Sequence, residues 1–272
     1  MNPDRERPFP RTVLLYSIGY GTYFLAKGVF VVCALPLLLV LWPFPRTKHR
    51  LLAAITHRYL IFLSRIWLPA LGLYLIVEIS GLEKALAARP AVLVANHRGR
   101  MDGPILLGLL PDTGIVIKAK EGRQASFALL MRNFDFIAVD PVRLSSAGRA
   151  LARAKEVLAA GRSLLVFPEG TRAATGRLGA FKGIAFQLAK EAGVPVVPVI
   201  VHSTIPFMAK RPGSLFPRGR NRFRIRFLDP ELPCPDDRPA DLGDRVRRRM
   251  AEALRPLDVG TVWETAPRAN HE

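Results

Sequence analysis

The residues best suited to chemistry are a histidine and an aspartate five positions apart. His97 follows an apolar, β-branched run over Ala91–Ala95, and Asp102 precedes Pro104, a residue favoured at the start of a helix. A tight turn between strand and helix would bring the Asp102 carboxylate to Nδ1 of His97. That contact would fix the imidazole tautomer and leave Nε2 as a base toward a hydroxyl group. Taken alone, the pair has a second interpretation, in which Asp102 only caps the helix and His97 is an ordinary loop histidine.

A second polar segment, Phe167–Arg172, follows another apolar run over Ser163–Phe167. Gly170 lets backbone N–H groups approach an anion closely, and the planar guanidinium of Arg172 suits a phosphate group. Glu169 either accepts a hydroxyl group or holds Arg172 in place. On its own, this segment could also be a polar turn with a local Glu–Arg pair.

Among the other histidines, His202 is the rival base, because it follows the apolar run Val194–Val201. Three more lie in basic or terminal stretches, where we expect them to be solvated: His49, His57 and His271. The two cysteines, Cys33 and Cys234, are far apart and lack a Cys-x-x-Cys spacing, so neither a disulfide framework nor a zinc site is expected.

From about residue 73, short β-branched runs alternate with helical patterns, which is typical of βαβ units. We therefore expect an α/β domain over residues 73–256, with a mixed, largely parallel sheet flanked by helices. Residues 1–72 would form a membrane-associated helical segment, and residues 257–272 a flexible tail. The expected strands are Leu73–Ile79, Ala91–Ala95, Ile115–Lys118, Phe136–Val139, Ser163–Phe167, Val194–Val201 and Arg222–Phe227. The expected helices are Pro104–Leu110, Phe127–Asn133, Ser145–Ala160, Phe181–Ala192 and Asp241–Arg255.

The composition of the chain points to a membrane surface. Its 272 residues include 40 Lys and Arg against 22 Asp and Glu, a formal net charge of +18, yet the mean hydropathy is +0.18. A protein seated on an anionic membrane can be both basic and apolar, whereas a nucleic-acid-binding module, the other class considered, is seldom apolar. Base-stacking aromatic residues do not interleave with the basic run in a recognised pattern, which also argues against nucleic acid.

The apolar residues are concentrated at the N-terminus, in Val13–Phe44 and Leu51–Ile79. No small-residue cleavage site follows the first stretch, which argues against a signal peptide. Its uninterrupted part, Gly28–Trp42, would rise only about 22 Å as a helix, short of a hydrocarbon core of roughly 30 Å. Basic residues flank both ends of this stretch. We therefore favour a two-helix hairpin seated in the membrane, with a helix that spans the membrane as the alternative.

The two polar segments together resemble the lysophosphatidic acid acyltransferase family of glycerolipid acyltransferases, the bacterial PlsC type. That family carries Asn-His, four residues and Asp, and later Phe-Pro-Glu-Gly-Thr-Arg. The resemblance covers about residues 75–205. The matching positions are Asn96, His97 and Asp102 for the first motif, Phe167–Arg172 for the second, and Phe181–Gly183 and Val194–Pro198 for two downstream features.

The resemblance implies transfer of an acyl group from acyl-CoA or acyl carrier protein to the hydroxyl of a lyso-lipid, at the cytoplasmic face of a bacterial inner membrane. His97 would act as general base and Asp102 would orient it. No metal and no bound cofactor is implied. No protein nucleophile is needed, since the thioester is already activated and the acceptor supplies the oxygen. Backbone N–H groups near Gly99 or Gly170 are the expected oxyanion donors. The implied substrate-binding residues are Asn96, Glu169, Gly170, Thr171 and Arg172, together with Lys118, Lys120 and Arg143.

One departure from the family bears on the acceptor. The family usually has a Phe-Ile-x-Arg-like block, but this chain reads Phe136–Asp140, with an acid where arginine is expected. Arg143 is a candidate replacement, and Lys118 and Lys120 both compete for the family's lysine. Lysophosphatidate, giving phosphatidic acid, is the first expectation. Lyso-ornithine lipid or another lyso-lipid is the alternative, and a catalytically silent lipid-binding protein is the non-enzyme alternative.

A basic run lies between Lys210 and Arg226 and contains no acidic residue. Within it, Arg222–Phe227 alternates strictly, which predicts a strand with one apolar face and three arginines on the other. The run is either a solvated basic face or a surface for anionic lipid headgroups or an acidic acyl carrier protein.

Overall fold

The computed structural model describes residues 10–119, 135–139, 144–173, 177–210, 214–216, 221–261 and 263. The helix expected over Phe127–Asn133 lies outside these residues, as do Lys120, Asp140 and Arg143.

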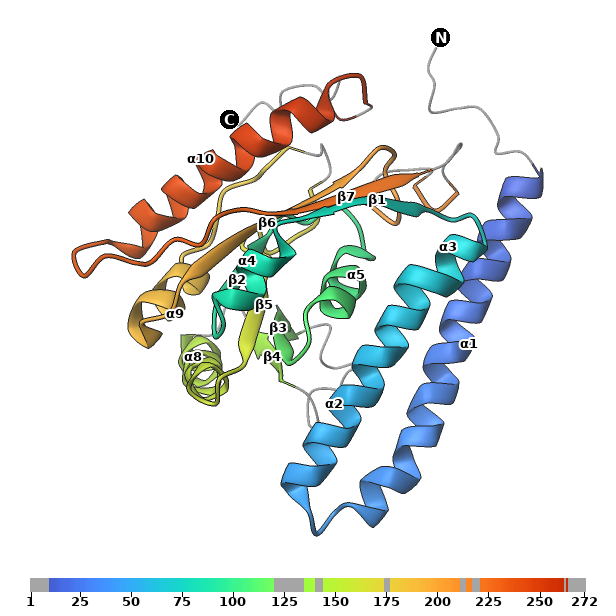
Figure 1. Cartoon of the computed structure of the whole chain (residues 1–272), viewed down its shortest axis with the longest axis horizontal. Coiled ribbons are helices and arrows are strands. Elements are labelled where there is room, and N and C mark those ends of the chain that lie inside the picture. The colour runs from blue at the N-terminus through green and yellow to red at the C-terminus, as the bar shows by residue number, and fades with distance from the viewer. Residues whose placement is uncertain are drawn as a thin grey trace.

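A seven-stranded sheet forms the centre of the described structure (Figure 1). Its strands are β1 (Leu75–Ser80), β2 (Val92–Ala95), β3 (Thr113–Lys118), β4 (Phe136–Val139), β5 (Ser163–Val166), β6 (Val196–Ser203) and β7 (Arg222–Phe227). They lie in the order β1-β7-β6-β2-β5-β3-β4. Between these strands the β6–β7 pairing is antiparallel and the others are parallel. The prediction of a mixed, largely parallel sheet is therefore confirmed.

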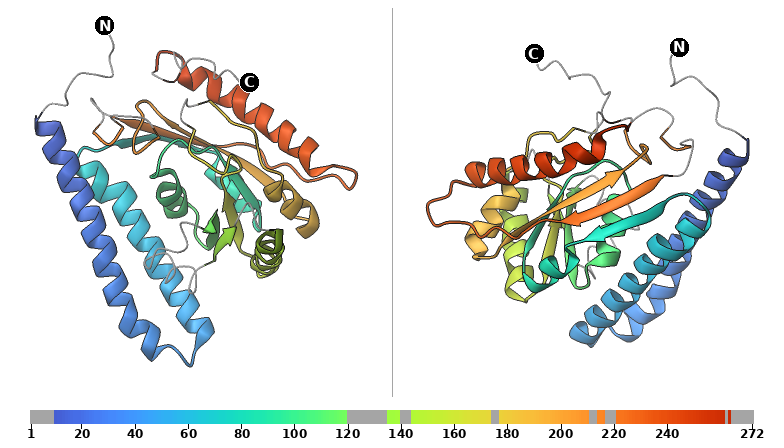
Figure 2. Two further views of the ribbon diagram at one scale, coloured as in Figure 1. Left: turned by 180° about the vertical axis from the view of Figure 1, so that it is seen from behind. Right: turned by 45° about the horizontal axis from the view of Figure 1, so that its top comes forward.

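Helices cover both faces of the sheet (Figures 1 and 2). One face is covered by α8 (Leu144–Ala159), α9 (Ile184–Ala192) and α10 (Pro239–Asp258), and the other by α5 (Asp102–Leu109) together with the N-terminal helices. Strand β2 is buried at every position, with Val92 and Val94 packed in one core and Leu93 and Ala95 in the other. A strand that is apolar on both faces is typical of such a covered parallel sheet. The short helix α4 (Leu82–Ala87), between β1 and β2, was not predicted.

Two long N-terminal helices stand side by side and extend beyond the sheet (Figure 2). They are α1 (Pro10–Val40) and α2 (Pro45–Ile61), the latter continuing through a π-helical turn, η2 (Phe62–Trp67), into α3 (Leu68–Ala70). The first part of α1 packs on the domain, where Tyr16 is buried against Phe207. The distal end exposes large apolar side chains, among them Leu39 and Trp42, each 74% exposed. By length and composition alone, the helical stretch Arg46–Ala70 could cross a membrane, and Val13–Ala26 within α1 is a shorter apolar helical segment.

The C-terminal boundary differs from the expected one. Helix α10 continues through Pro256 to Asp258, and Trp263 is buried, whereas we expected a flexible tail from residue 257. The physical reason is a set of contacts with the domain: Asp258 forms an ion pair with Arg98, and the Trp263 indole donates to the carbonyl of Ser203.

Candidate active site

The two predicted motifs meet at one edge of the sheet. Strands β2 and β5 are parallel neighbours, with Val94 paired to Val166, so the loops that follow them lie at the same carboxyl edge. This is where open α/β sheets bind their ligands. Nδ1 of His97 lies 2.9 Å from Oδ2 of Asp102, which is the contact expected from the spacing of the two residues.

Asp102 is buried and is held by the turn before it. Its Oδ2 accepts the backbone N–H groups of Arg98 at 2.7 Å and Gly99 at 2.8 Å, in addition to the contact with His97. Asp102 is the first residue of α5 and Met101 is the N-cap, so the carboxylate bonds to the preceding turn and not to the helix as a cap would. A Cβ at position 99 would overlap the carbonyl of Phe207, so glycine is needed for this close approach.

The His97 ring is held from one side and remains partly open. Phe167, the first residue of the second motif, stacks on it with ring centroids 4.2 Å apart. The His97 side chain is 22% exposed, whereas that of Asp102 is 1% exposed. The arrangement orients the imidazole through Nδ1 and leaves part of the ring accessible to a substrate, as a general base requires.

Glu169 joins the two motifs from within the protein. Its Oε1 accepts the backbone N–H of His97 and its Oε2 accepts that of Gly179, both at 3.0 Å. Burial raises the pKa of this carboxyl group, against the opposing effect of the two backbone hydrogen bonds. The carboxylate therefore has two partners in the protein, and the contact with Gly179 had no signal in the sequence.

Asn96 also bonds within the fold. Its side-chain amide donates to the carbonyl of Val201 at 2.8 Å and accepts the N–H of Val201 at 2.7 Å. The residue is buried, so it ties the end of β2 to β6. We had expected it to bind substrate, and the structure places its amide on the backbone instead.

Oxyanion donors were expected near Gly99 or Gly170, and the N–H groups of these two glycines already have acceptors. The N–H of Gly99 donates to Asp102, and that of Gly170 donates to the carbonyl of Phe167 at 3.0 Å. Gly170 has a positive φ of 63°, which favours glycine at this tight turn. The turns therefore use both glycine N–H groups, and oxyanion binding by other backbone N–H groups near these glycines stays a prediction.

The remaining predicted residues differ in their placement. Arg172 donates from Nη1 to the carbonyl of Met208 at 2.7 Å, and the Thr171 hydroxyl accepts from Nζ of Lys210 at 2.6 Å. Thr171 and Lys210 are both exposed. From the sequence, Lys210 was assigned only to the basic run, but in the structure it contacts the loop of the second motif. Lys118 is exposed at the end of β3, and β5 lies between that strand and β2.

His202 is not placed to act as the rival base. It is fully buried at the end of β6, and burial lowers its pKa to about 4, with the charge of Arg98 acting in the same direction. A neutral, enclosed imidazole has no access to a substrate hydroxyl.

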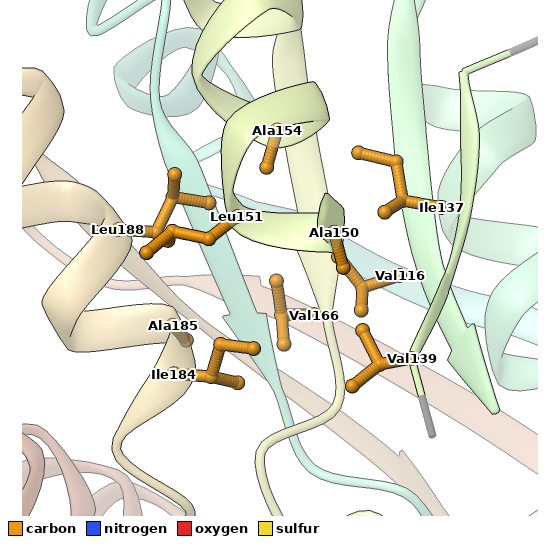
Figure 3. A pocket seen from close by; sticks show the side chains of 10 residues that line it. All are labelled: Val116, Ile137, Val139, Ala150, Leu151, Ala154, Val166, Ile184, Ala185 and Leu188. Atoms are coloured by element: carbon orange, nitrogen blue, oxygen red, sulfur yellow. The ribbon is translucent and has the colours of Figure 1, made fainter. Parts of the chain in front are cut away.

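Two cavities lie away from His97 and Asp102. Figure 3 shows apolar side chains from α8, α9 and the strands pointing into the first of them. Its volume is about 10 Å³, which amounts to a small packing gap. A second cavity, of about 60 Å³, is lined by both polar and apolar residues, among them His57, Asp112 and Asp135. Among the described residues, no group of three or more His, Cys, Asp and Glu side chains could hold a metal ion.

The fold and the paired motifs define an α/β acyltransferase domain, and comparison with known proteins agrees. The model of the acyltransferase family matches residues 76–202. The 1-acyl-sn-glycerol-3-phosphate acyltransferase alpha of Mus musculus is 33% identical over 190 residues, which cover 67% of this chain and 65% of that protein. The chloroplastic 1-acyl-sn-glycerol-3-phosphate acyltransferase BAT2 of Brassica napus is 28% identical over 261 residues, which cover 93% of this chain and 71% of that protein.

The crystal structure of the 1-acyl-sn-glycerophosphate acyltransferase PlsC from Thermotoga maritima has the same fold. Its TM-score is 0.67 at 21% identity, covering 92% of this chain and 97% of that one. The chain belongs to the lysophosphatidic acid acyltransferase family, as the two motifs indicated.

Proposed function

We propose that this chain transfers a fatty acyl group from an acyl thioester to the free hydroxyl of 1-acyl-glycerol-3-phosphate, giving phosphatidic acid. The observation that carries the proposal is the His97–Asp102 contact of 2.9 Å beside the loop of the second motif. The relatives are named 1-acyl-sn-glycerol-3-phosphate acyltransferases, which supports the choice of acceptor. The enzyme is accordingly an O-acyltransferase.

In the proposed mechanism, His97 Nε2 takes the proton of the acceptor hydroxyl as its oxygen attacks the thioester carbonyl. The tetrahedral intermediate collapses with cleavage of the C–S bond, and the proton passes from His97 to the leaving thiolate. Asp102 stabilises the transient imidazolium through Nδ1 and keeps the ring in orientation. The thioester supplies the activated acyl group, so no acyl-enzyme intermediate is required.

We assign recognition of the acceptor's phosphate to the rim beside this pair. Thr171 and Lys210 are exposed and already in contact, and Arg172 lies next to them with one guanidinium nitrogen bound to Met208. Arginine and lysine donors together suit a phosphate monoester. Glu169 and Asn96 act behind the site, through the backbone contacts they make with His97 and Val201.

The two-helix hairpin is proposed to seat the enzyme in the membrane at its cytoplasmic face. Exposed apolar side chains gather at its distal end, including Val40, Trp42 and Phe44. Large exposed apolar patches mark interaction surfaces, and a bilayer is the surface on which a lyso-lipid acceptor is found. Both acyl-CoA and acyl carrier protein remain candidate donors.

A panel of acceptors tests the proposed activity. The purified protein is given lysophosphatidate, lyso-ornithine lipid or other lyso-lipids with acyl-CoA or acyl carrier protein as donor. We expect phosphatidic acid to form from lysophosphatidate faster than any other product. Turnover of another lyso-lipid with no phosphatidic acid would overturn the choice of acceptor, and no turnover of any acceptor would overturn the activity.

A further inference from the structure

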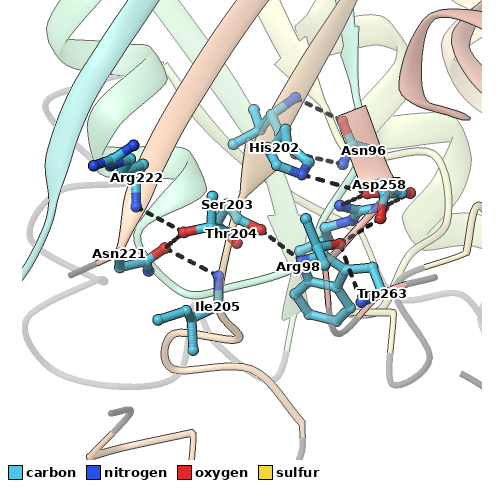
Figure 4. A network of polar contacts seen from close by, with 12 residues as sticks. Asn96, Arg98, His202, Ser203, Thr204, Ile205, Asn221, Arg222, Asp258 and Trp263 are labelled. Carbon is cyan, nitrogen blue, oxygen red and sulfur yellow. Dashed lines mark hydrogen bonds and ion pairs between the residues drawn. The ribbon is translucent and has the colours of Figure 1, made fainter. Parts of the chain in front are cut away.

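The residue that follows the catalytic histidine reaches into a buried network behind the site (Figure 4). Arg98 is 2% exposed, and its Nη1 and Nη2 lie 2.7 Å from Oδ1 and Oδ2 of Asp258, the last residue of α10. A bidentate pair of this kind fixes the plane of the guanidinium as well as its position. Because Arg98 is almost fully buried, the Asp258 carboxylate compensates a guanidinium charge that water reaches poorly.

A tryptophan beyond α10 completes the enclosure of Arg98. The Trp263 ring lies 4.8 Å from the guanidinium carbon, within range of a cation–π contact, and its indole N–H donates to the carbonyl of Ser203 at 2.6 Å. The turn between helix and tryptophan is formed by Thr261, whose N–H and hydroxyl both donate to the carbonyl of Asp258. Trp263 is thereby held against β6 and Arg98.

Arg98 also contacts the catalytic pair through its backbone. Its N–H donates at 2.7 Å to Oδ2 of Asp102, the same oxygen that lies 2.9 Å from Nδ1 of His97. One residue is therefore held at its side chain by Asp258 and at its backbone by Asp102. A shift of the guanidinium would move the turn that carries His97.

We propose that Asp258 is a positioning residue for the acyl transfer proposed above: by holding Arg98, it keeps Nδ1 of His97 on Asp102. The inference rests on the proposed function for its kinetic consequence. Residue 258 lies beyond the match to the family model, which ends at residue 202, so the family motifs do not assign it. The C-terminal end of α10 thus contributes to the site through Arg98.

The same helix offers a matched control. Arg245 of α10 forms another bidentate pair, with Nη1 and Nη2 at 2.8 and 2.7 Å from the two carboxylate oxygens of Asp237. This pair also links α10 to the segment before it, but it has no contact with the catalytic turn among the interactions recorded for the described residues. Asp258→Asn and Asp237→Asn therefore remove equivalent charges at different places.

The test measures kcat and KM of the full-length variants with lysophosphatidate and acyl-CoA. Asp258→Asn should lower kcat by roughly tenfold or more while KM for either substrate changes less than about threefold, because binding groups stay in place and the base loses its orientation. Asp237→Asn should retain kcat within about twofold. A folded Asp258→Asn protein with the kcat of the Asp237→Asn control would overturn the proposal.

A spectroscopic measurement separates this inference from the proposed activity. The low-field proton NMR signal of His97 Nδ1–H, assigned by its loss in His97→Ala, should shift or broaden in Asp258→Asn and stay unchanged in Asp237→Asn. Absence of turnover by the wild type would overturn the activity alone, and an unchanged signal would overturn the positioning role alone. Should Asp258→Asn not fold, Arg98→Lys decides by the same signal: it keeps the backbone N–H that Asp102 accepts but loses the bidentate pair with Asp258, so the signal should shift or broaden. An unchanged signal in folded Arg98→Lys would overturn the positioning role.

Discussion

The carboxylate of Glu169 accepts the backbone N–H of His97 at 3.0 Å, although the two residues are 72 positions apart in the chain. Phe167 stacks on the imidazole of the same residue, so two residues of the second motif hold the backbone and the ring of His97. The two motifs thus form one site because each orients the other. Mutual support of this kind keeps a catalytic base within the narrow geometry that proton transfer requires.

Replacing Glu169 should lower the activity of the enzyme while its thermal stability changes little. Glu169→Gln leaves one carbonyl oxygen for two backbone N–H donors, so we expect kcat to fall by roughly tenfold or more. Burial raises the pKa of Glu169, so its ionised form opposes folding at neutral pH, and removing that charge should offset the lost hydrogen bond. Thermal unfolding should therefore change little. The exposed Glu156→Gln is the control, and equal kcat in both variants would contradict the account.

The tip of the two-helix hairpin, the exposed end that carries Leu39 and Trp42, should control membrane binding. Burial of a large apolar side chain contributes about 1.5–3 kcal/mol, so replacing Leu39 and Trp42 with serine should weaken binding to vesicles by at least about a hundredfold. Leu232 and Val259 are the controls, since they are 68% and 64% exposed but lie outside the hairpin. Vesicle flotation measures the effect. Equal flotation of the two double variants would show that the tip does not enter the bilayer.

The arginines of β7 should strengthen binding to anionic lipid. Phe223, Ile225 and Phe227 are buried, and the arginines lie on the opposite face of the strand, as its alternation predicted. The basic run itself contains no acidic residue, but Glu78 of the neighbouring strand β1 lies 2.5 Å from Arg226 and 3.7 Å from Arg224.

Each basic residue near an anionic surface contributes about 1 kcal/mol, and salt screens that contribution. The triple variant Arg222→Gln, Arg224→Gln, Arg226→Gln should therefore lose binding to anionic vesicles at low salt and differ little from wild type at high salt. Zwitterionic vesicles are the control. A loss that is equal at low and high salt would contradict an electrostatic role.

Buried His202 should make the fold sensitive to acid. Its pKa is lowered from 6.5 to about 4, so below pH 6.5 the unfolded chain binds a proton that the folded chain does not. Stability is therefore full above pH 6.5 and falls by up to about 3 kcal/mol as the pH drops to 4. The groups facing the ring are Arg98, Asp258, Arg224 and Arg226. His202→Leu should flatten the fall in unfolding midpoint between pH 7 and 5, and an unchanged slope would contradict this assignment.

The sequence predicted the parts of the site that depend on local order. His97 and Asp102 straddle the end of a strand and the start of a helix, so their contact follows from a short turn. The alternation of strands and helices likewise implied parallel neighbours whose loops share an edge. These features depend on residues that are close in the chain or on the general geometry of parallel sheets.

Contacts between distant segments could not be predicted in the same way. Glu169 was expected to accept a hydroxyl group or to hold Arg172, and Gly170 to let backbone N–H groups approach an anion. In the structure Glu169 accepts two backbone N–H groups, and the N–H of Gly170 closes its own turn. The burial of Trp263 and the pairing of Asp258 with Arg98 depend on how α10 packs against β6. Pro256 and the charged residues around it predicted that the chain frays after Arg255. Contacts with distant segments instead keep α10 helical to Asp258.

Single-turnover kinetics of His97→Ala show whether His97 is the base for acyl transfer to lysophosphatidate. Wild-type or variant protein, in excess over labelled acyl-CoA, is mixed with it and with saturating lysophosphatidate. Thermal unfolding checks that each variant is folded, and His57→Ala is the control. We expect phosphatidic acid from the wild type and from His57→Ala, and a rate at least about a thousandfold lower from folded His97→Ala. Phosphatidic acid formed by His97→Ala at the wild-type rate would contradict the account.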